Sequence, residues 1–483
     1  TDGTEWFPIP YNETILVLKD SSVYLKCENY DLLLPTMGNT VYSCGPYLNT
    51  CHVIQINAEG EVVVEPILDL MSIYTGTSGT FVLRGANKTL WVTGSNISGQ
   101  LGLGDENPRV IFTDTGVTDV KYVGAGLTHT MIIKEDDTVW AAGDNYRGQL
   151  GLGHNNDVSV FTDTGHTCVK IVTSELYTSM LKADGTVWTC GINLYGQLGL
   201  GDTTSRNLFT DTGVANIVDI TTGKEFIMIV DNVGKLYSTG TNGNGQLGVG
   251  DTTNRNVFTD TGMTNVQKID LGSTFSLVLR TDGAVWACGA NGNGQLGLGH
   301  DGFRDVFEDT SMRDVEDIFA GSGSSLLVKT DRTLWGTGSN TSGQLGLGAT
   351  AEVDVFTDTG MTNVKKVDRW NVSTYIVKDD DTLWVTGSNG RGQLGLGHES
   401  GIDVFTDTGL LVNDVIVNGT ACHATIKGDT VLYSVGFNDD GQLGLGNTND
   451  YSTFTSTGVD VTHGGTGGII DRRITDYGTN EPE

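Results

Sequence analysis

The 483-residue sequence has few positive charges. Its 28 Lys and Arg residues stand against 59 Asp and Glu residues, which gives a formal net charge of −31. A phosphate backbone is bound through clustered Lys and Arg side chains, which release its counterions. A chain this acidic repels nucleic acids and anionic lipid surfaces, so we expect neither as a partner.

Long apolar runs and proline are also scarce. No stretch approaches the ~18 apolar residues that a membrane helix requires, and the first ten residues, TDGTEWFPIP, lack the basic and apolar parts of a signal peptide. We therefore expect no membrane insertion and no signal peptide. The chain has 7 prolines but 68 glycines, and only 18% of its residues are charged. This composition argues against disorder and predicts an all-β chain with many tight turns.

The seven cysteines are an odd number, and none has the CxxC spacing of a zinc or redox site. Cys190 and Cys288 each follow a tryptophan by two positions, where equivalent positions elsewhere hold Thr or Ala. We expect them to be small buried side chains in a reducing environment. A disulfide between Cys44 and Cys51 is the alternative.

A repeat of about 49 residues dominates the chain. The string GQLGLG or GQLGVG occurs eight times, with successive copies 49 residues apart six times and 48 once. An aromatic residue and a phenylalanine recur with the same step, so one supersecondary unit is stacked many times. The glutamines are Gln100, Gln149, Gln197, Gln246, Gln295, Gln344, Gln393 and Gln442; the aromatics are Trp91, Trp140, Trp188, Tyr237, Trp286, Trp335, Trp384 and Tyr433; the phenylalanines are Phe112, Phe161, Phe209, Phe258, Phe307, Phe356, Phe405 and Phe454.

Each unit has the apolar pattern of about four short strands. Residues 276–279 (SLVL), a Thr-Asp-Gly turn and residues 284–287 (AVWA) predict a hairpin, and further strands are expected near 257–258 and 266–269. Four antiparallel strands in about 50 residues are typical of a propeller blade. We expect the aromatic and phenylalanine positions to face the neighbouring blade and to form the core between blades.

These observations predict a single β-propeller of about eight four-stranded blades over residues 62–470. Residues 1–61 form an N-terminal extension with a degenerate repeat, since Tyr42 lies one step before Trp91, and residues 471–483 form a C-terminal tail. Residues 459–470 resemble the first strands of a further unit, so the two ends of the ring could share a blade. Seven blades plus extra repeats are the alternative.

The segment from Trp286 to Gly297, WACGANGNGQLG, resembles the repeat of the regulator of chromosome condensation family, and the resemblance covers roughly residues 65–460. It implies a β-propeller. The founding member is a nucleotide exchange factor for a small GTPase and carries an inserted wedge, for which the constant spacing here leaves no room. It also docks on chromatin through basic segments, whereas the tail here reads DRRITDYGTNEPE.

Several motifs that resemble functional sites are explained by the repeat. The Asp-Thr-Gly triplets resemble the aspartic protease motif, but each ends the same strand of a different unit, so we expect turns. Histidines and aspartates directly after the glycine string belong to non-adjacent units or lack the spacing of a calcium loop, so we predict no metal ligands. We predict no catalytic residue and no cofactor. The triplets begin at Asp114, Asp163, Asp211, Asp260, Asp358 and Asp407; the residues after the string include His154, His300, His398, Asp105, Asp202 and Asp251.

The near-identical units, with no residue set that breaks their symmetry, predict a non-enzymatic structural and interaction protein. The lysine-poor surface rich in Gly, Thr, Asn and Asp favours a virion component, such as a bacteriophage tail or capsid-decorating protein that presents loops to a host-surface receptor. An exposed aromatic segment requires burial, so Trp6, Phe7, Ile9 and Tyr11 are the predicted docking residues toward other structural proteins of the assembly.

Two alternatives remain open. The first is a cytoplasmic regulator that resembles the exchange factor and binds a small GTPase on one face of the propeller. The second is a surface lectin or adhesin, which would require aromatic platforms in its loops; Tyr146 and Tyr195 are the repeated candidates.

Overall fold

A computed structural model describes residues 72–460 except positions 77, 86, 371 and 420, and the eight strands that lie before residue 72. The chain divides into two compact units, one formed mainly by Thr1–Ser72 and the other mainly by Lys88–Val461. No helix long and apolar enough to cross a membrane occurs in this described part. The predicted all-β class is confirmed.

The first unit contains two four-stranded antiparallel sheets, β1 to β4 and β5 to β8. Trp6 and Phe7 lie in β1, opposite Val17 and Leu16 of β2. The side chains of these two residues lie outside the described part, as do Ile9, Tyr11 and the predicted cysteine pair. The strands are β1 (Glu5–Pro8), β2 (Ile15–Lys19), β3 (Ser22–Cys27), β4 (Tyr30–Leu33), β5 (Thr36–Met37), β6 (Thr40–Ser43), β7 (His52–Ile56) and β8 (Val62–Pro66).

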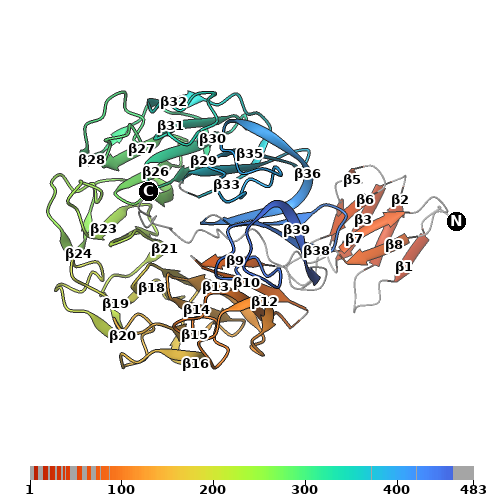
Figure 1. The fold of residues 1–483 in the computed structure, drawn as a ribbon, viewed down its shortest axis with the longest axis horizontal. Helices are drawn as coiled ribbons and strands as arrows, with labels where there is room; N and C mark the ends of the chain where they lie inside the picture. The colour runs from red at the N-terminus through yellow and green to blue at the C-terminus, as the bar shows by residue number, and fades with distance from the viewer. Residues whose placement is uncertain are drawn as a thin grey trace. The chain divides into compact units, whose positions relative to one another are not determined.

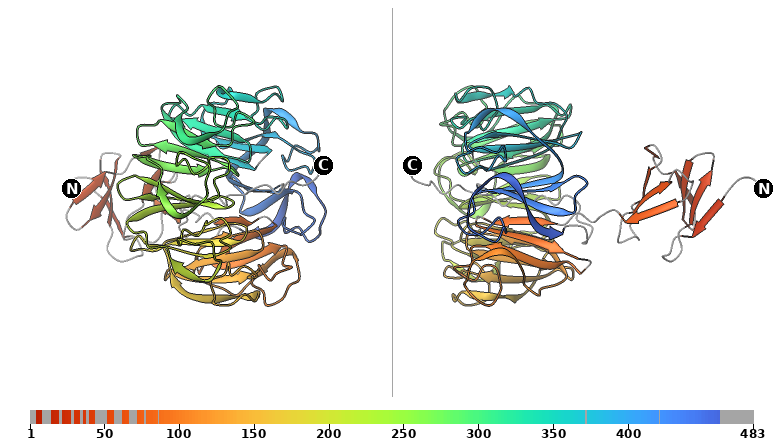
Figure 2. Two further views of the ribbon diagram at one scale, coloured as in Figure 1. Left: turned by 90° about the vertical axis from the view of Figure 1, so that its left-hand side faces the viewer. Right: turned by 45° about the vertical axis from the view of Figure 1, so that its right-hand side comes forward.

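The second unit is a ring of eight blades, each with four antiparallel strands that follow chain order from the centre to the rim (Figure 1 and Figure 2). Blades 1 to 4 comprise β9 (Ile73–Gly76), β10 (Gly79–Arg84), β11 (Thr89–Gly94) and β12 (Arg109–Asp114); β13 (Val120–Ala125), β14 (His129–Lys134), β15 (Thr138–Gly143) and β16 (Val158–Thr167); β17 (Lys170–Thr173), β18 (Tyr177–Leu181), β19 (Val187–Gly191) and β20 (Arg206–Asp211); and β21 (Ile217–Thr222), β22 (Phe226–Asp231), β23 (Leu236–Gly240) and β24 (Arg255–Asp260).

Blades 5 to 8 repeat this order and complete the predicted eight-bladed propeller. Their strands are β25 (Val266–Leu271), β26 (Phe275–Arg280), β27 (Val285–Gly289) and β28 (Arg304–Asp309); β29 (Val315–Ala320), β30 (Ser324–Lys329), β31 (Leu334–Gly338) and β32 (Val353–Asp358); β33 (Val364–Trp370), β34 (Ser373–Lys378), β35 (Thr382–Gly387) and the first part of β36 (Ile402–Asn418); and the second part of β36 with β37 (Ala421–Ile426), β38 (Val431–Gly436) and β39 (Tyr451–Asp460).

Strand β36 serves two blades, and its crossover lacks the residue with positive φ that is found in most other crossovers. Its first part pairs with β35 and its second part with β37. In most other crossovers an Asn or Asp with positive φ, such as Asn265 at 57° or Asn363 at 57°, precedes the innermost strand and ends the extended conformation. Leu411 occupies this position in β36, so the strand continues from the rim of blade 7 to the centre of blade 8.

Each blade is joined to the next by the loop that carries GQLGLG, called here the glycine loop. The second leucine or valine of that loop forms a bridge with the outermost strand of the following blade, from Leu103 with Val160 around the ring to Leu396 with Thr453. The same bridge between Leu445 and Ile111 joins blade 8 to blade 1. The ring of described residues therefore closes through this bridge. Most of residues 459–470, on which the predicted sharing of a blade by the two ends rests, lie outside the described residues.

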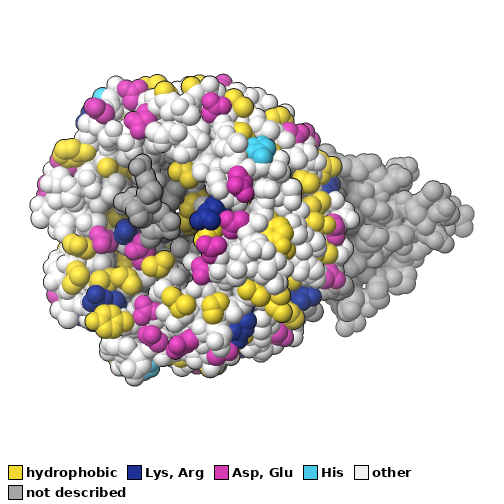
Figure 3. Space-filling model, viewed as in Figure 1, with side chains coloured by type: hydrophobic (Ala, Val, Ile, Leu, Met, Phe, Trp, Pro, Cys, Tyr) yellow, Lys and Arg dark blue, Asp and Glu magenta, His cyan; other side chains and the backbone are white. Residues whose placement is uncertain are grey.

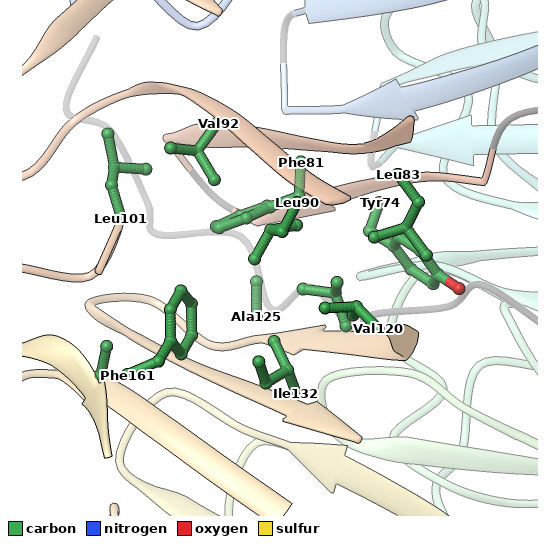
Figure 4. Close-up of a cluster of buried hydrophobic side chains, with 12 residues drawn as sticks. Tyr74, Phe81, Leu83, Leu90, Val92, Leu101, Val120, Ala125, Ile132 and Phe161 are labelled. Atoms are coloured by element: carbon green, nitrogen blue, oxygen red, sulfur yellow. The ribbon is translucent and has the colours of Figure 1, made fainter. Parts of the chain in front are cut away.

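The core consists of apolar layers between blades. Alternate residues of each strand point to opposite faces, so every blade packs on both neighbours. Figure 4 shows one layer, in which Phe81 and Leu101 of blade 1 face Ile132, Ala125 and Phe161 of blade 2. This confirms the predicted role of the phenylalanines.

The tryptophans occupy the edge of these layers and are only half-buried. The Nε1 of Trp140 donates to the Oγ1 of Thr138 at 3.1 Å, and the Nζ of Lys134 lies 5.2 Å from the ring centroid. The indole therefore packs one face and hydrogen-bonds at the surface. Cys190 and Cys288 are fully buried and free, as the sequence predicts.

Candidate functional site: the glycine-loop face

The glycine loops and the loops between the first two strands of each blade emerge on one face of the ring. In four antiparallel strands, the loops after the first and third strands lie at the same end. We call this end the glycine-loop face. It carries the features that differ between blades.

Buried amide side chains hold every glycine loop in one conformation. The Oδ1 of Asn242 accepts from the main-chain N–H of Leu247 at 2.9 Å, and its Nδ2 donates to the carbonyl of Asp251 at 2.8 Å. The Oε1 of Gln246 accepts from the N–H of Asn244 at 3.0 Å. These asparagines are not among the residues predicted from the sequence, although they recur four residues before each glutamine: Asn96, Asn145, Asn193, Asn242, Asn291, Asn340, Asn389 and Asn438.

The aspartates and histidines after the glycine string cap turns. Asp105 accepts from Arg109 at 2.7 Å and from the N–H of Asn107 at 2.9 Å, and the hydrogen bond from Arg109 lowers the pKa of Asp105 to about 2. The Nδ1 of His154 accepts from the N–H of Asn156 at 3.2 Å. No group of three His, Cys, Asp or Glu side chains that could hold a metal ion is found within the residues that the structure describes.

The Asp-Thr-Gly triplets form the predicted turns on the opposite face. The Oδ1 of Asp114 accepts from the N–H of Gly116 at 2.8 Å, and the Oγ1 of Thr115 donates to the carbonyl of Leu90 at 2.8 Å. The same Asp-to-Gly hydrogen bond occurs at the other five copies. The six aspartates lie in different blades, so none is paired with another as a protease requires.

The position after each buried asparagine breaks the symmetry of this face. A β-carbon at Gly243 or Gly292 would meet no heavy atom within 4 Å, so a side chain at this position projects into open space. Blades 1 to 3 nevertheless place large apolar residues in this part of the loop. These are Ile97, Tyr146, Leu194 and the next residue Tyr195, which are 67%, 70%, 58% and 39% exposed. We call these four side chains the apolar sector.

The exposed apolar residues on the outermost strands have a structural explanation. Val160, Leu208 and Val257 are exposed there, but each is the bridge partner of the preceding glycine loop. Seven blades have an apolar residue at this bridge position, and blade 8 has Thr453. The apolar sector is present in three consecutive blades and makes no such bridge, so the fold does not account for it.

Blades 4 to 7 carry a polar hollow of about 470 Å³ on the same face. Small side chains create it: Ser273 and Ser322 occupy the loop position where blade 2 has Leu127. We call this cavity the polar hollow. It is lined by Lys224, Glu225, Thr241, Asn244, Gln246, Ser273, Thr274, Asn293, Ser322, Gly323, Ser339, Thr341, Gln344 and Val372.

Lysine and aspartate alternate at one position of the innermost strands of blades 3 to 8. This pattern is not among the features predicted from the sequence. The Nζ of Lys170 lies 2.7 Å from Asp219 of the next blade, and Lys268 and Lys366 form the same pairs with Asp317 and Asp414. Figure 3 shows Lys or Arg side chains next to Asp or Glu side chains around the centre of the ring. The pairs link neighbouring blades near the axis, so we interpret them as structural.

Comparison with known proteins identifies the family. The RCC1-like domain model matches residues 158–471, nearly two thirds of the chain, and the regulator of chromosome condensation (RCC1) repeat matches residues 120–149. The chain belongs to the RCC1-like domain family. A comparison of the chain with curated proteins found no match.

Solved structures share the fold at low sequence identity. Yeast RCC1 (Prp20) bound to Kap60 superposes with a TM-score of 0.55 and 18% identity, covering 70% of this chain and 88% of that one. Prp20p from Saccharomyces cerevisiae has a TM-score of 0.55 and 19% identity over 72% and 91% of the two chains. Human WBSCR16 has a TM-score of 0.55 and 19% identity over 68% and 95%. These likenesses establish the propeller fold.

Proposed function

We propose that this RCC1-like propeller is a non-enzymatic, protein-binding regulator whose partner docks on the apolar sector. The observation that carries the proposal is the placement of four large apolar side chains at loop positions that the fold leaves open. Tyrosine is among the side chains that supply most of the binding energy at the centre of an interface, where the surrounding core is apolar. Since the chain has a net charge of −31, we expect a partner with a basic rim around its apolar contact, which would also speed association.

The family match supports a protein partner. The Prp20 structures describe that protein's complex with Kap60 and its binding to Gsp1p and histones. Since the resemblance to the exchange factor implies a small GTPase as partner, this is the class we propose. The virion prediction receives no support from the family match or the structural neighbours, and it ranks below the regulator.

The composition of the apolar sector favours a protein over a glycan as ligand. Tyr146 and Tyr195, the two candidate aromatic platforms, lie in the same sector as the aliphatic Ile97 and Leu194. The guanidinium of Arg147 lies 4.9 Å from the ring centroid of Tyr146. A mixture of aromatic, aliphatic and arginine side chains is typical of protein interfaces.

The test replaces the four side chains of the apolar sector with the residues found at the same loop positions in blades 4 and 5. The sector variant carries Ile97→Gly, Tyr146→Gly, Leu194→Gly and Tyr195→Asn. The control variant carries Val257→Thr and Val306→Thr, because blade 8 has Thr453 at that bridge position. Both variants remove exposed apolar side chains without changing loop length.

Tagged forms are expressed in the native source, and copurifying proteins are quantified by mass spectrometry. We expect a stoichiometric partner with the wild type and the control, reduced at least about tenfold with the sector variant. A candidate GTPase is then tested for accelerated nucleotide release. An unchanged partner with the sector variant would refute docking there, and recovery of the chain in a particle with coat or tail proteins would restore the virion prediction.

A further inference from the structure

The polar hollow is lined by hydrogen-bonding groups for which the described part of the chain supplies no side-chain hydrogen bond. Among the residues that the structure describes, no side-chain hydrogen bond engages the hydroxyl and amide groups at eight positions of its lining. In blade 2, by contrast, the Oγ1 of Thr128, at the loop position of Thr274, donates to Asp144 at 3.1 Å. The eight residues are Thr241, Asn244, Ser273, Thr274, Asn293, Ser322, Ser339 and Thr341.

The lining is held in place by main-chain hydrogen bonds within each blade. The N–H of Thr241 donates to the carbonyl of Glu225 at 2.9 Å, and the N–H of Ser339 donates to the carbonyl of Gly323 at 2.8 Å. The same bond joins the two loops of blade 5, from the N–H of Ala290 to the carbonyl of Thr274 at 2.9 Å. The unused groups therefore project from rigid loops, which lowers the entropy lost when they bind a ligand.

The chemistry of the lining defines the ligand. Hydroxyls and carboxamides both donate and accept hydrogen bonds without charge, and the two charged residues, Lys224 and Glu225, come from a single loop of blade 4. Lys224 is already 3.5 Å from Glu175. Among the described residues that line the hollow there is no aromatic ring on which a sugar could stack, and Val372 is the one branched aliphatic residue. Such a surface matches the alternating N–H and carbonyl groups of an extended peptide with small uncharged side chains.

We propose that the polar hollow is a binding site for an extended, uncharged segment of a polypeptide, recognised mainly through its main-chain amides. The volume of about 470 Å³ lies within the range of ordinary ligand sites. The hollow spans blades 4 to 7 and the apolar sector spans blades 1 to 3, so this site does not depend on the docking function proposed above. Its ligand can be the same partner or a different one.

The test uses the full chain and a fluorescent library of uncharged nonapeptides composed of Gly, Ser, Thr and Asn. A filled variant carries Ser273→Leu and Ser322→Leu, which blade 2 tolerates at the same loop position as Leu127. The matched control is Leu127→Ser, outside the hollow. Thr341→Leu, at an exposed position of the rim, is a second blocking variant that does not depend on loop repacking.

We expect fluorescence anisotropy to show saturable binding by a subset of peptides. Binding should weaken at least about tenfold in the filled variant and in Thr341→Leu, and should be unchanged in Leu127→Ser and in the sector variant. The proposal is overturned if no peptide binds below about 1 mM, if both blocking variants bind as the wild type does, or if uncharged oligosaccharides such as maltoheptaose bind the hollow in place of the peptides. Loss of binding in the sector variant would also overturn an independent site.

Discussion

The seam between blade 8 and blade 1 should weaken in acid because of one buried imidazole. His423 of β37 is fully buried, with its Nε2 3.0 Å from the Oγ1 of Thr80 in blade 1 and its Nδ1 2.8 Å from the Oγ of Ser434. The hydroxyl of Thr80 donates to the carbonyl of Gln442 at 2.9 Å. The Nε2 must therefore carry a hydrogen and donate it to Thr80. In the neutral imidazole, which burial favours, Nδ1 then accepts from Ser434.

Burial of the His423 imidazole determines how strongly the stability depends on pH. It lowers the pKa of His423 from 6.5 to about 3. As the pH falls below 6.5, the unfolded chain binds a proton at this residue and the folded chain does not, so the free energy of unfolding decreases with falling pH. At 1.36 kcal/mol for each unit of difference between the two pKa values, His423 makes the free energy of unfolding about 5 kcal/mol higher above pH 6.5 than below about pH 3.

The assay compares urea unfolding of the wild type and His423→Met between pH 7 and pH 4. Met131 and Met228 occupy the same register in blades 2 and 4, so methionine fits this kind of layer. The wild type should lose several kcal/mol more than the variant over this interval. His129, whose pKa burial lowers to about 4, is present in both proteins and cancels in the comparison. Parallel pH profiles for the two proteins would refute the reasoning, and His398→Asn serves as the surface-loop control.

Four further perturbations test the glycine loops, an Asp-Thr-Gly turn and the innermost strands. Gly151→Ala brings a methyl group 2.4 Å from a ring carbon of the next blade's outer phenylalanine and should destabilise by about 2–4 kcal/mol in thermal unfolding. Gly213→Ala meets no atom within 4 Å and should cost only the strain of positive φ, about 1 kcal/mol, in the same thermal assay. Asn242→Ala removes the partner of the buried N–H of Leu247 and of the carbonyls of Asp251 and Thr253. It should cost about 2–4 kcal/mol in urea unfolding; an unchanged midpoint would contradict its role. Because the side chains of Lys170 and Asp219 are 36% and 40% exposed, a double-mutant cycle should give at most about 1 kcal/mol, decreasing with salt.

The fold could be predicted because each blade repeats the same physical requirement. A glycine beside the outer phenylalanine is required wherever the ring packs on the loop: a β-carbon at Gly102 would lie 2.3 Å from the ring of Phe161. Eight copies of that requirement make the unit length, the strand count and the apolar layers readable from spacing alone. The sharing of a blade by the two ends could not be decided in this way, since the seam uses the same bridge as every other junction.

The candidate site could not be read from the repeat because a repeat shows what is common to all blades. Tyr146 and Tyr195 were recognised as unusual, but Ile97 and Leu194 gain meaning only when the structure shows that their positions face open space. The polar hollow depends on the absence of side-chain volume at Ser273, which has no signature in a single sequence. The buried asparagines were readable in principle, since they recur with the same step as the glutamines.

Two kinds of asymmetry in this ring follow different patterns. The Lys and Asp residues from Lys170 to Asp414 alternate between successive blades, and each lysine pairs with an aspartate of the adjacent blade, so the fold itself explains why that position varies. The residues of the apolar sector do not alternate with another residue type from blade to blade. Within the described residues they form no pair with the next blade like that between lysine and aspartate. They occupy three consecutive blades and then give way to glycine, threonine and aspartate. Variation confined to one sector, at a position with no packing constraint, is expected when selection acts through a partner that contacts only that part of the ring.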